Sequence, residues 1–205
     1  MIEKQLEIIE KSSLIFMRNG IKSVTMDDLA KHLGMSKKTI YKYFKDKNDL
    51  ISKIMTAKVE LDKMACENAK SNAENAIDEL VLISKFVSEM FGEVHTSVFF
   101  DLQKYHRDAW DIMENHKTNY VKKQILDNIE RGIKEGLYRI DLNKEVIAAA
   151  YISTMDAIFE NKGQLLGNLN FSEVLTEVIR FQIRGMANEE GLNYLRKRLN
   201  KENNA

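Results

Sequence analysis

The sequence predicts an all-α protein, with a small N-terminal three-helix domain followed by a larger helical domain. Proline, the residue that most strongly interrupts helices, is absent from all 205 residues. Lys, Glu, Leu, Ile and Ala, which favour helices or tolerate them well, are abundant. Gly20, Gly34 and Gly136 each follow an amphipathic stretch, at the position where glycine commonly ends a helix.

Two short helices joined by a tight turn are predicted near the N-terminus. Thr25 can cap the first of them, and the acidic residues that follow it favour the positive end of the helix dipole. Gly34 ends this helix and Ser36 can cap the next. That next helix buries Ile40 and Phe44, which are four residues apart and so share a face. With the helix that precedes them, the expected N-terminal helices lie at 3–19, 26–33 and 37–44.

The remainder of the chain is expected to form seven further helices. Asp46 and Ser172 can each cap one of these helices, because short polar side chains accept hydrogen bonds from the free N–H groups of a helix start. Asn143 or Asp141 can cap another. The expected helices run from 47 into the 60s and then over 76–91, 94–106, 107–134, 144–162, 173–187 and 189–200. A loop or a frayed helix end is expected at 68–75, and a polar loop at 163–170.

The exposed faces of the predicted 37–44 helix carry lysines, a threonine and tyrosines. A short helix with a polar, cationic and aromatic surface, placed after a glycine turn, is typical of a helix-turn-helix. The second helix of that motif enters the major groove of DNA. This stretch is therefore the strongest functional signal in the chain.

The same stretch resembles the N-terminal signature of the TetR (tetracycline-repressor-like) transcriptional regulators. The resemblance extends to about residue 55. It implies a helix-turn-helix DNA-binding domain at 1–47 and a helical effector-binding and dimerisation domain at 48–205. The residues that match the signature are Thr25, Gly34-Met35-Ser36, Thr39-Ile40-Tyr41-Lys42-Tyr43-Phe44 and Lys47.

Residues for two kinds of DNA contact can be named. Phosphate contacts need positive charge or hydrogen-bond donors and fix the register of the protein on DNA, and the resemblance gives this role to Thr25, Tyr41 and Lys47. Lysines at the front of helix 37–44 can reach guanine O6 and N7, and Thr39 can meet a thymine methyl group. Tyr43 could contact DNA or pack against the core. The predicted DNA-binding residues are Thr25, Ser36, Lys37, Lys38, Thr39, Tyr41, Lys42, Tyr43 and Lys47.

The charge distribution agrees with contact to DNA at the N-terminal end. The formal net charge is zero, but residues 1–58 hold 12 Lys and Arg against 7 Asp and Glu, and residues 59–205 hold 19 against 24. A basic N-terminal part suits a protein that presents this end to phosphate. Ordinary variation of surface charge is the alternative explanation.

A homodimer on a palindromic operator is expected, because one short helix reads only a few base pairs. Two copies must reach successive major grooves, roughly 34–36 Å apart. Helix 173–187 carries more apolar residues than a single buried face requires. By resemblance, this helix and helix 144–162 of each protomer form a four-helix bundle in the dimer. The same residues could instead fill the core of a monomer. Small residues that permit close helix approach in 144–162 are Ala148, Ala149, Ala150, Ser153 and Ala157.

A pocket for a small apolar effector is a weaker expectation. Large apolar side chains are frequent between residues 86 and 120, and ligand pockets are mostly apolar with a few polar anchors. Aromatic residues at helical spacing are, however, core residues more often than pocket residues. The predicted lining residues are Phe86, Met90, Phe99, Tyr105, Trp110, Met113, Tyr151 and Met155.

The sequence contains no motif typical of a metal site or an enzyme active site. The four histidines form no i, i+4 pair, and no nucleotide-binding or hydrolase motif is present, so we expect no metal, no cofactor and no enzyme activity. The single cysteine, Cys66, allows no intrachain disulfide, which agrees with a cytoplasmic protein. We expect no membrane span and no signal peptide, because no apolar run of the necessary kind occurs.

The sequence therefore predicts a DNA-binding transcriptional regulator, most plainly a repressor that a small-molecule effector releases from its operator. The alternative is a helical enzyme or binding module in which the N-terminal motif serves only packing. A third outcome is a lysine patch that binds DNA without sequence preference. Steep loss of DNA binding with added salt would separate the DNA-binding hypotheses from the packing one.

Overall fold

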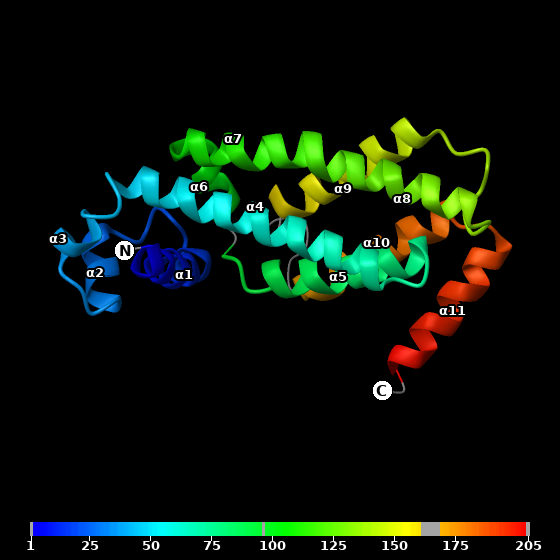
Figure 1. Cartoon of the computed structure of the whole chain (residues 1–205), viewed down its shortest axis with the longest axis horizontal. Coiled ribbons are helices and arrows are strands. Elements are labelled where there is room, and N and C mark those ends of the chain that lie inside the picture. Colours follow the sequence, from blue (N-terminus) through cyan, green and yellow to red (C-terminus); the bar gives the residue numbers. More distant parts are fainter. Residues whose placement is uncertain (1, 96, 161–168, 204–205) are drawn as a thin grey trace. The chain divides into compact units, whose positions relative to one another are not determined.

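The computed structural model describes residues 2–95, 97–160 and 169–203. All regular elements in these residues are helices, apart from one isolated antiparallel bridge between Tyr138 and Ala187, so the all-α prediction is confirmed (Figure 1). The chain separates into two compact units. Unit 1 comprises Met1–Asp62 and Glu93–His116, and unit 2 comprises Lys63–Gly92 and Lys117–Ala205.

Unit 1 consists of the N-terminal three-helix domain together with α6, α7 and the first part of α4. Phe16, Leu29, Ile40 and Phe44 are at most 1% exposed and form the centre of the N-terminal helices, as the spacing of Ile40 and Phe44 predicts. The buried Leu50 lies at the start of α4. The helices of this unit are α1 (Ile2–Asn19), α2 (Met26–His32), α3 (Lys37–Ile40), the first part of α4 (Lys47–Asn72), α6 (Val98–Tyr105) and α7 (Arg107–Asn115).

The α6 segment of unit 1 is bonded to the turn between α1 and α2. The buried Asp101 of α6 accepts a hydrogen bond from the backbone N–H of Lys22 at 2.9 Å. Just before α6, the N–H of His95 donates to the carbonyl of Met17 at 2.6 Å. Residues far apart in the sequence therefore fix the turn that leads into α2.

Two helix boundaries in the first part of the chain differ from the prediction. The regular part of the helix predicted at 37–44 ends at Ile40, because Lys42 and Tyr43 donate to carbonyls three residues back, which tightens the chain into turns. Residues 68–75, expected to be a loop or a frayed helix end, remain helical up to Asn72, where α4 ends. Ser71 and Asn72 bond their side chains to the carbonyl of Asn68, so these polar residues complete the last turn of the helix instead of breaking it.

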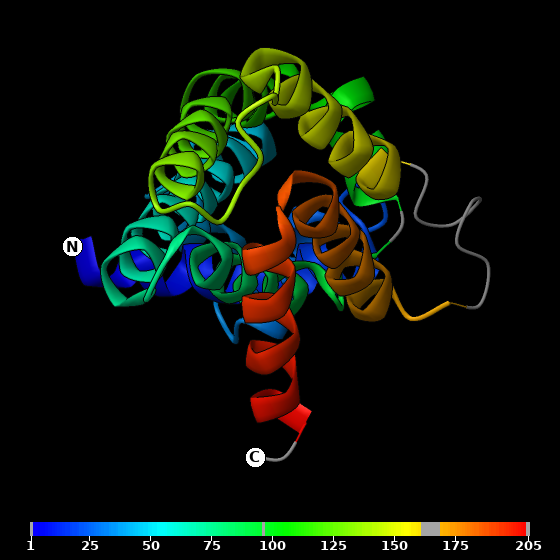
Figure 2. The ribbon, with the colours of Figure 1, turned by 90° about the vertical axis from the view of Figure 1, so that its right-hand side faces the viewer.

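Unit 2 is a bundle in which α5 packs on α10, α8 and α11, and α8 packs on α9. The α11 helix extends away from α10 at a steep angle (Figures 1 and 2). The elements of this part are α5 (Ala76–Phe91), the π-helix η1 (His116–Val121), α8 (Lys122–Lys134), α9 (Lys144–Glu160), α10 (Phe171–Met186) and α11 (Glu189–Asn203).

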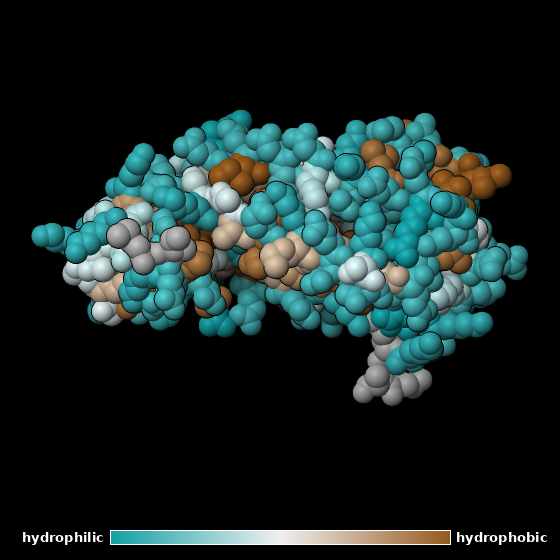
Figure 3. Space-filling model, in the orientation of Figure 1, coloured by the Kyte–Doolittle hydropathy of each residue, from teal (hydrophilic) through white to brown (hydrophobic). Residues whose placement is uncertain are grey.

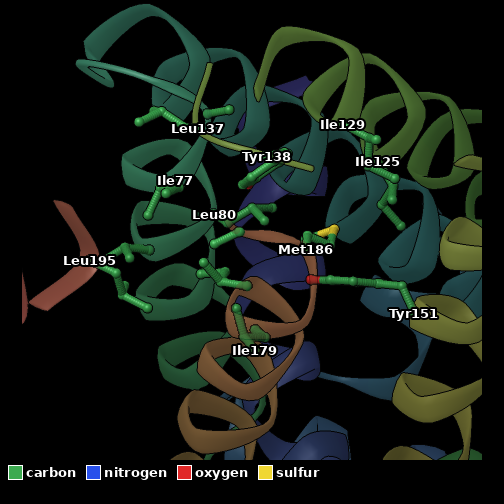
Figure 4. Close-up of a cluster of buried hydrophobic side chains, with 14 of the residues drawn as sticks. Ile77, Leu80, Ile125, Ile129, Leu137, Tyr138, Tyr151, Ile179, Met186 and Leu195 are labelled. Carbon is green, nitrogen blue, oxygen red and sulfur yellow. The ribbon is translucent and has the colours of Figure 1, made fainter. Parts of the chain in front are cut away.

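The core of unit 2 draws side chains from every helix of the bundle. Ile77 of α5, Ile129 of α8 and Ile183 of α10 are fully buried in it. Tyr151 points from α9 toward α10, and Tyr138 fills the space beside α8 (Figure 4). The Tyr138 hydroxyl donates to Asn128 at 3.1 Å, so this buried polar group is satisfied.

Other predicted boundaries in this part of the chain also need correction. The helix expected at 107–134 is interrupted by the π-helix η1, whose wider turn the apolar spacing did not reveal. The helix expected from 94 begins only at Val98. Asn170, not Ser172, caps α10, and Asn143 rather than Asp141 bonds the first turn of α9. Within the expected loop at 163–170, residues 163–168 lie outside the described residues, as do 161 and 162 of the expected helix 144–162.

Among the described helices, none is both long enough and apolar enough to cross a membrane. Hydrophilic side chains cover most of the face in Figure 3, with hydrophobic ones in small separate patches.

Candidate nucleic-acid interface

A capping box begins α2, the first helix of the predicted helix-turn-helix. The Thr25 hydroxyl accepts a hydrogen bond from the N–H of Asp28, and the Asp28 carboxylate accepts one from the N–H of Thr25 at 2.9 Å. The Thr25 hydroxyl also donates to the Asp28 carboxylate at 2.6 Å, and this bond, together with the one from the Thr25 N–H, lowers the pKa of the Asp28 carboxyl. The predicted cap is thus confirmed, and its reciprocal bonds fix where α2 begins.

A left-handed glycine and a serine cap set the turn from α2 to α3. Gly34 has φ +62°, a conformation that side chains with a Cβ rarely adopt. Ser36 caps α3 by accepting from the N–H of Thr39, and the two hydroxyls lie 2.8 Å apart. The buried Ile40 then holds α3 against the core of the N-terminal helices, which leaves the opposite face of α3 outward.

The outward face of α3 and the turn after it carry cations and an aromatic ring. Lys38 and Lys42 are exposed, and Tyr41 is 43% exposed. Thr39 and Tyr43 are half-buried, so their side chains are available only in part. The structure thus brings these five predicted DNA-binding residues onto one short segment.

Lys37, at the first position of α3, is not free in the structure. Its ammonium lies 2.8 Å from the carboxylate of Asp27 in α2, and this hydrogen bond raises the pKa of Lys37. The sequence analysis did not anticipate the pair. The two residues are ten positions apart, and only the tight turn brings them together.

Lys47, at the first position of α4, is bound by backbone carbonyls. Its ammonium donates to the carbonyls of Ile21 and Val24, at 2.6 Å each, and lies 5.4 Å from the centre of the Phe16 ring. Burial lowers the pKa of Lys47, against the opposing charges of acidic neighbours. An ammonium has three donors, so one remains for a phosphate while the other two join α4 to the α1–α2 turn.

Residues 8–54, which contain all of these features, match the model of the family described as bacterial regulatory proteins, tetR family. This match assigns the N-terminal part of the chain to the TetR family of transcriptional regulators. The N-terminal helices are therefore the DNA-binding helix-turn-helix of that family. The chain is not an enzyme, in agreement with the sequence analysis.

Relatives of the whole chain are also regulators. An uncharacterized HTH-type transcriptional regulator of Bacillus subtilis, YvaF, is 22% identical over 174 residues, covering 82% of this chain and 88% of its own. The fold matches that of FadR from Bacillus subtilis in complex with stearoyl-CoA, at 18% identity, TM-score 0.68 and coverage of 88% and 98%. It also matches a putative regulator from Saccharomonospora viridis in complex with choline. The identity is 17% and the TM-score 0.72, and the match covers 92% of this chain and 100% of the other.

The residues predicted to line an effector pocket of this TetR-family regulator are divided between the two units. Tyr105 is 40% exposed and accepts a hydrogen bond from Lys22, whereas Tyr151 packs into the unit 2 core. A separate surface recess of about 360 Å³ is lined by polar residues of α10 that the sequence analysis did not select. The pocket assignment stays a prediction. Unit 1 holds Phe99, Tyr105, Trp110 and Met113, and unit 2 holds Phe86, Met90, Tyr151 and Met155.

The two helices predicted for dimerisation each keep an apolar or small-residue face uncovered. On α9, Ala148 is buried, but Ala149, Ala150, Ser153 and Ala157 are exposed. On α10, Leu175, Ile179 and Ile183 are buried while Phe181 is 74% exposed. The packing of this single chain therefore does not bury all of the apolar surface of α9 and α10.

Two residues that matter to the site escaped the sequence analysis. Asp27 was seen only as an acid that favours the start of α2, and its pairing with Lys37 depends on the turn geometry. Lys58 of α4 was not singled out at all. The signal was present, because Lys58 follows Ile51 by seven residues and Ile54 by four, so a lysine stands on an apolar stripe.

Proposed function

We propose that this regulator is a homodimeric repressor that binds a palindromic operator and is released from it by a small-molecule effector. In this proposal residues 1–47 form the DNA-binding domain, and residues 48–205 bind the effector and form the dimer. The protein acts in the cytoplasm, where bacterial DNA is found. The sign of regulation is supported by a 19% identical relative, the HTH-type transcriptional repressor KstR2 of Mycobacterium tuberculosis.

The observation that carries the proposal is the outward surface of α3. Lys38, Tyr41 and Lys42 are exposed on a segment whose other face is anchored by buried Ile40 and Phe44. A cationic, aromatic surface on a rigid helix start is what base-edge and phosphate contacts require. Lys37 joins this surface when DNA takes the place of Asp27, and Thr25, Ser36, Thr39, Tyr43 and Lys47 complete the proposed contact set.

The exposed faces of α9 and α10 support the dimer. Phe181 and the small residues Ala149, Ala150 and Ser153 would meet their copies across a two-fold axis, where small residues allow close helix approach. A two-fold dimer uses the same patch on both protomers and presents two copies of α3 to a symmetric site. A palindromic operator follows from that symmetry.

Ligands in related structures support an effector. The related regulators hold stearoyl-CoA in one case and choline in another. In our proposal a bound effector favours a conformation in which the two α3 helices no longer match successive major grooves. The effector can do so only if it binds that conformation more tightly than the DNA-binding one.

The test is selection of bound duplexes from a random-sequence library at physiological salt. We expect a palindromic site to be enriched by the wild-type protein. Tyr41→Ala and Lys38→Ala should abolish the enrichment, whereas Lys123→Ala, which removes an exposed lysine of α8, should keep it. Failure of the wild-type protein to enrich any site would contradict sequence-specific regulation. Weak binding that depends only on salt would instead favour a non-specific lysine patch.

A further inference from the structure

A lysine without a partner lies on the buried stripe of α4. Within unit 1 this stripe includes Ile51, Ile54 and Met55, each at most 3% exposed. Lys58 continues it by helical spacing and is itself half-buried. Within the described part of the chain, Lys58 takes part in no hydrogen bond and no ion pair. The exposed lysine Lys70 of the same helix, by contrast, has Asp127 within 4.0 Å.

Two hydrogen bonds join the residues that flank α7 to α4, one on each side of Lys58 along that helix. His106 Nδ1 lies 2.6 Å from Asn48 Oδ1, and His116 Nε2 lies 2.6 Å from Asp62 Oδ2. Lys58 lies one helical turn before Asp62, on the same side of α4 and between the two bonds. It therefore belongs to the stretch of α4 that α7 accompanies.

The most deeply buried face of α7 is apolar, and one of its half-buried acids, Glu114, already interacts with another residue. Between its two histidines, the residues that α7 buries most fully are Ala109 and Trp110, and the half-buried Met113 continues their spacing. Burial lowers the pKa of Lys58. The acid one turn further along α4, Asp62, is already bonded to His116. A desolvated ammonium without a counter-charge is costly, so an anion placed beside it gains more than it would at an exposed lysine.

We propose that Lys58 binds the head group of the effector, and that the effector is a carboxylate with an apolar body. Phe99, Trp110 and Met113, three of the predicted pocket residues, belong to the same compact unit and would contact the apolar body. The inference rests on the proposed function in one respect, since the bound molecule is taken to be the effector. It excludes a cation such as choline and favours anions.

The test compares decanoate with 1-decanol, which share an alkyl chain and differ in charge at neutral pH. Their binding to the full-length protein is measured by displacement of the fluorescent apolar probe N-phenyl-1-naphthylamine. We expect the wild-type protein to bind decanoate about tenfold or more tightly than decanol, because a charge-assisted hydrogen bond is gained. In Lys58→Met, whose side chain has similar length and no charge, the two affinities should agree within about twofold.

Lys70→Met is the matched control, because it removes a lysine of the same helix from an exposed, paired position. It should keep the preference for decanoate. A wild-type protein that binds neither probe, or both equally, overturns the proposal, as does a preference that survives in Lys58→Met. Circular dichroism checks that the variant folds, and Lys58→Gln replaces it if it does not.

The two proposals fail separately. If the protein selects an operator but shows no preference for decanoate, only the carboxylate inference is contradicted. If the protein prefers decanoate through Lys58 but selects no operator, the repressor proposal is contradicted and the anion site is supported.

Discussion

Asp27 of α2 holds the Lys37 ammonium of α3 at 2.8 Å, across the turn of the helix-turn-helix. Both side chains are well exposed, so the pair contributes little to stability. Its consequence concerns binding, because in the proposed complex DNA would replace Asp27 as the partner of Lys37. The acid therefore acts as an internal competitor for one of the cations that would contact DNA.

Asp27→Asn should strengthen DNA binding. We expect the affinity for the selected operator to rise about threefold to tenfold, for two reasons. Lys37 no longer has to break an ion pair before it contacts DNA, and the substitution removes a negative charge that would repel the phosphates. Fluorescence anisotropy at fixed salt measures the change. Asp108→Asn, which removes an exposed acid of α7, is the control for net charge. Equal effects of the two substitutions would show that the pair with Lys37 is irrelevant.

Lys47→Met should destabilise the protein. The substitution leaves the carbonyls of Ile21 and Val24 without their donor, and we expect the free energy of unfolding to fall by about 1–3 kcal/mol. Urea denaturation followed by circular dichroism measures the loss. Lys45→Met, at an exposed position two residues earlier, should stay within about 0.5 kcal/mol of the wild type. The argument fails if the two variants are equally stable.

Phe181→Arg should separate the dimer. A charge at this exposed apolar position of α10 would be buried without a partner in the proposed interface. Sedimentation velocity should show monomers for this variant at concentrations where the wild-type protein is dimeric. Ile140→Arg changes the 89% exposed isoleucine before α9 and should leave the dimer intact. A dimeric Phe181→Arg protein would place the interface elsewhere.

The stability of the protein should fall as the pH decreases through the titration of His106. Burial, helped by the charge of Lys47 and opposed by Asp101, lowers the pKa of His106. The unfolded chain therefore takes up the proton first as pH falls, and stability is lost below the ordinary histidine pKa of about 6.5. Urea denaturation between about pH 7 and pH 5 should show a smaller loss for His106→Gln than for the wild type. Equal losses would refute this role.

Local signals in the sequence determined much of the N-terminal part of the fold. Thr25 and Gly34 determined the two ends of α2, and Ser36 the start of α3, because capping and left-handed glycine depend on residues a few positions apart. The burial of Ile40 and Phe44 followed from their spacing. These features need no knowledge of the rest of the chain, which explains why they could be predicted.

Features that depend on distant segments could not be predicted in the same way. The Lys47 ammonium bonds the α1–α2 turn only because tertiary packing brings Ile21 and Val24 to it. The π-helix that starts at His116 widens a helix whose apolar spacing looked regular. The place of Lys58 on an apolar stripe can be read from the sequence, but its lack of a hydrogen-bond or ion-pair partner among the described residues cannot.

The affinity ratio between the selected palindromic duplex and a scrambled duplex, both at physiological salt, tests the central claim most directly. Sequence-specific regulators commonly favour their site by about 10³ or more, and we predict a ratio of at least this order for the wild-type protein. Tyr41→Ala should bring the ratio close to one. A wild-type ratio near one, with binding that merely weakens as salt is added, would contradict a sequence-specific repressor.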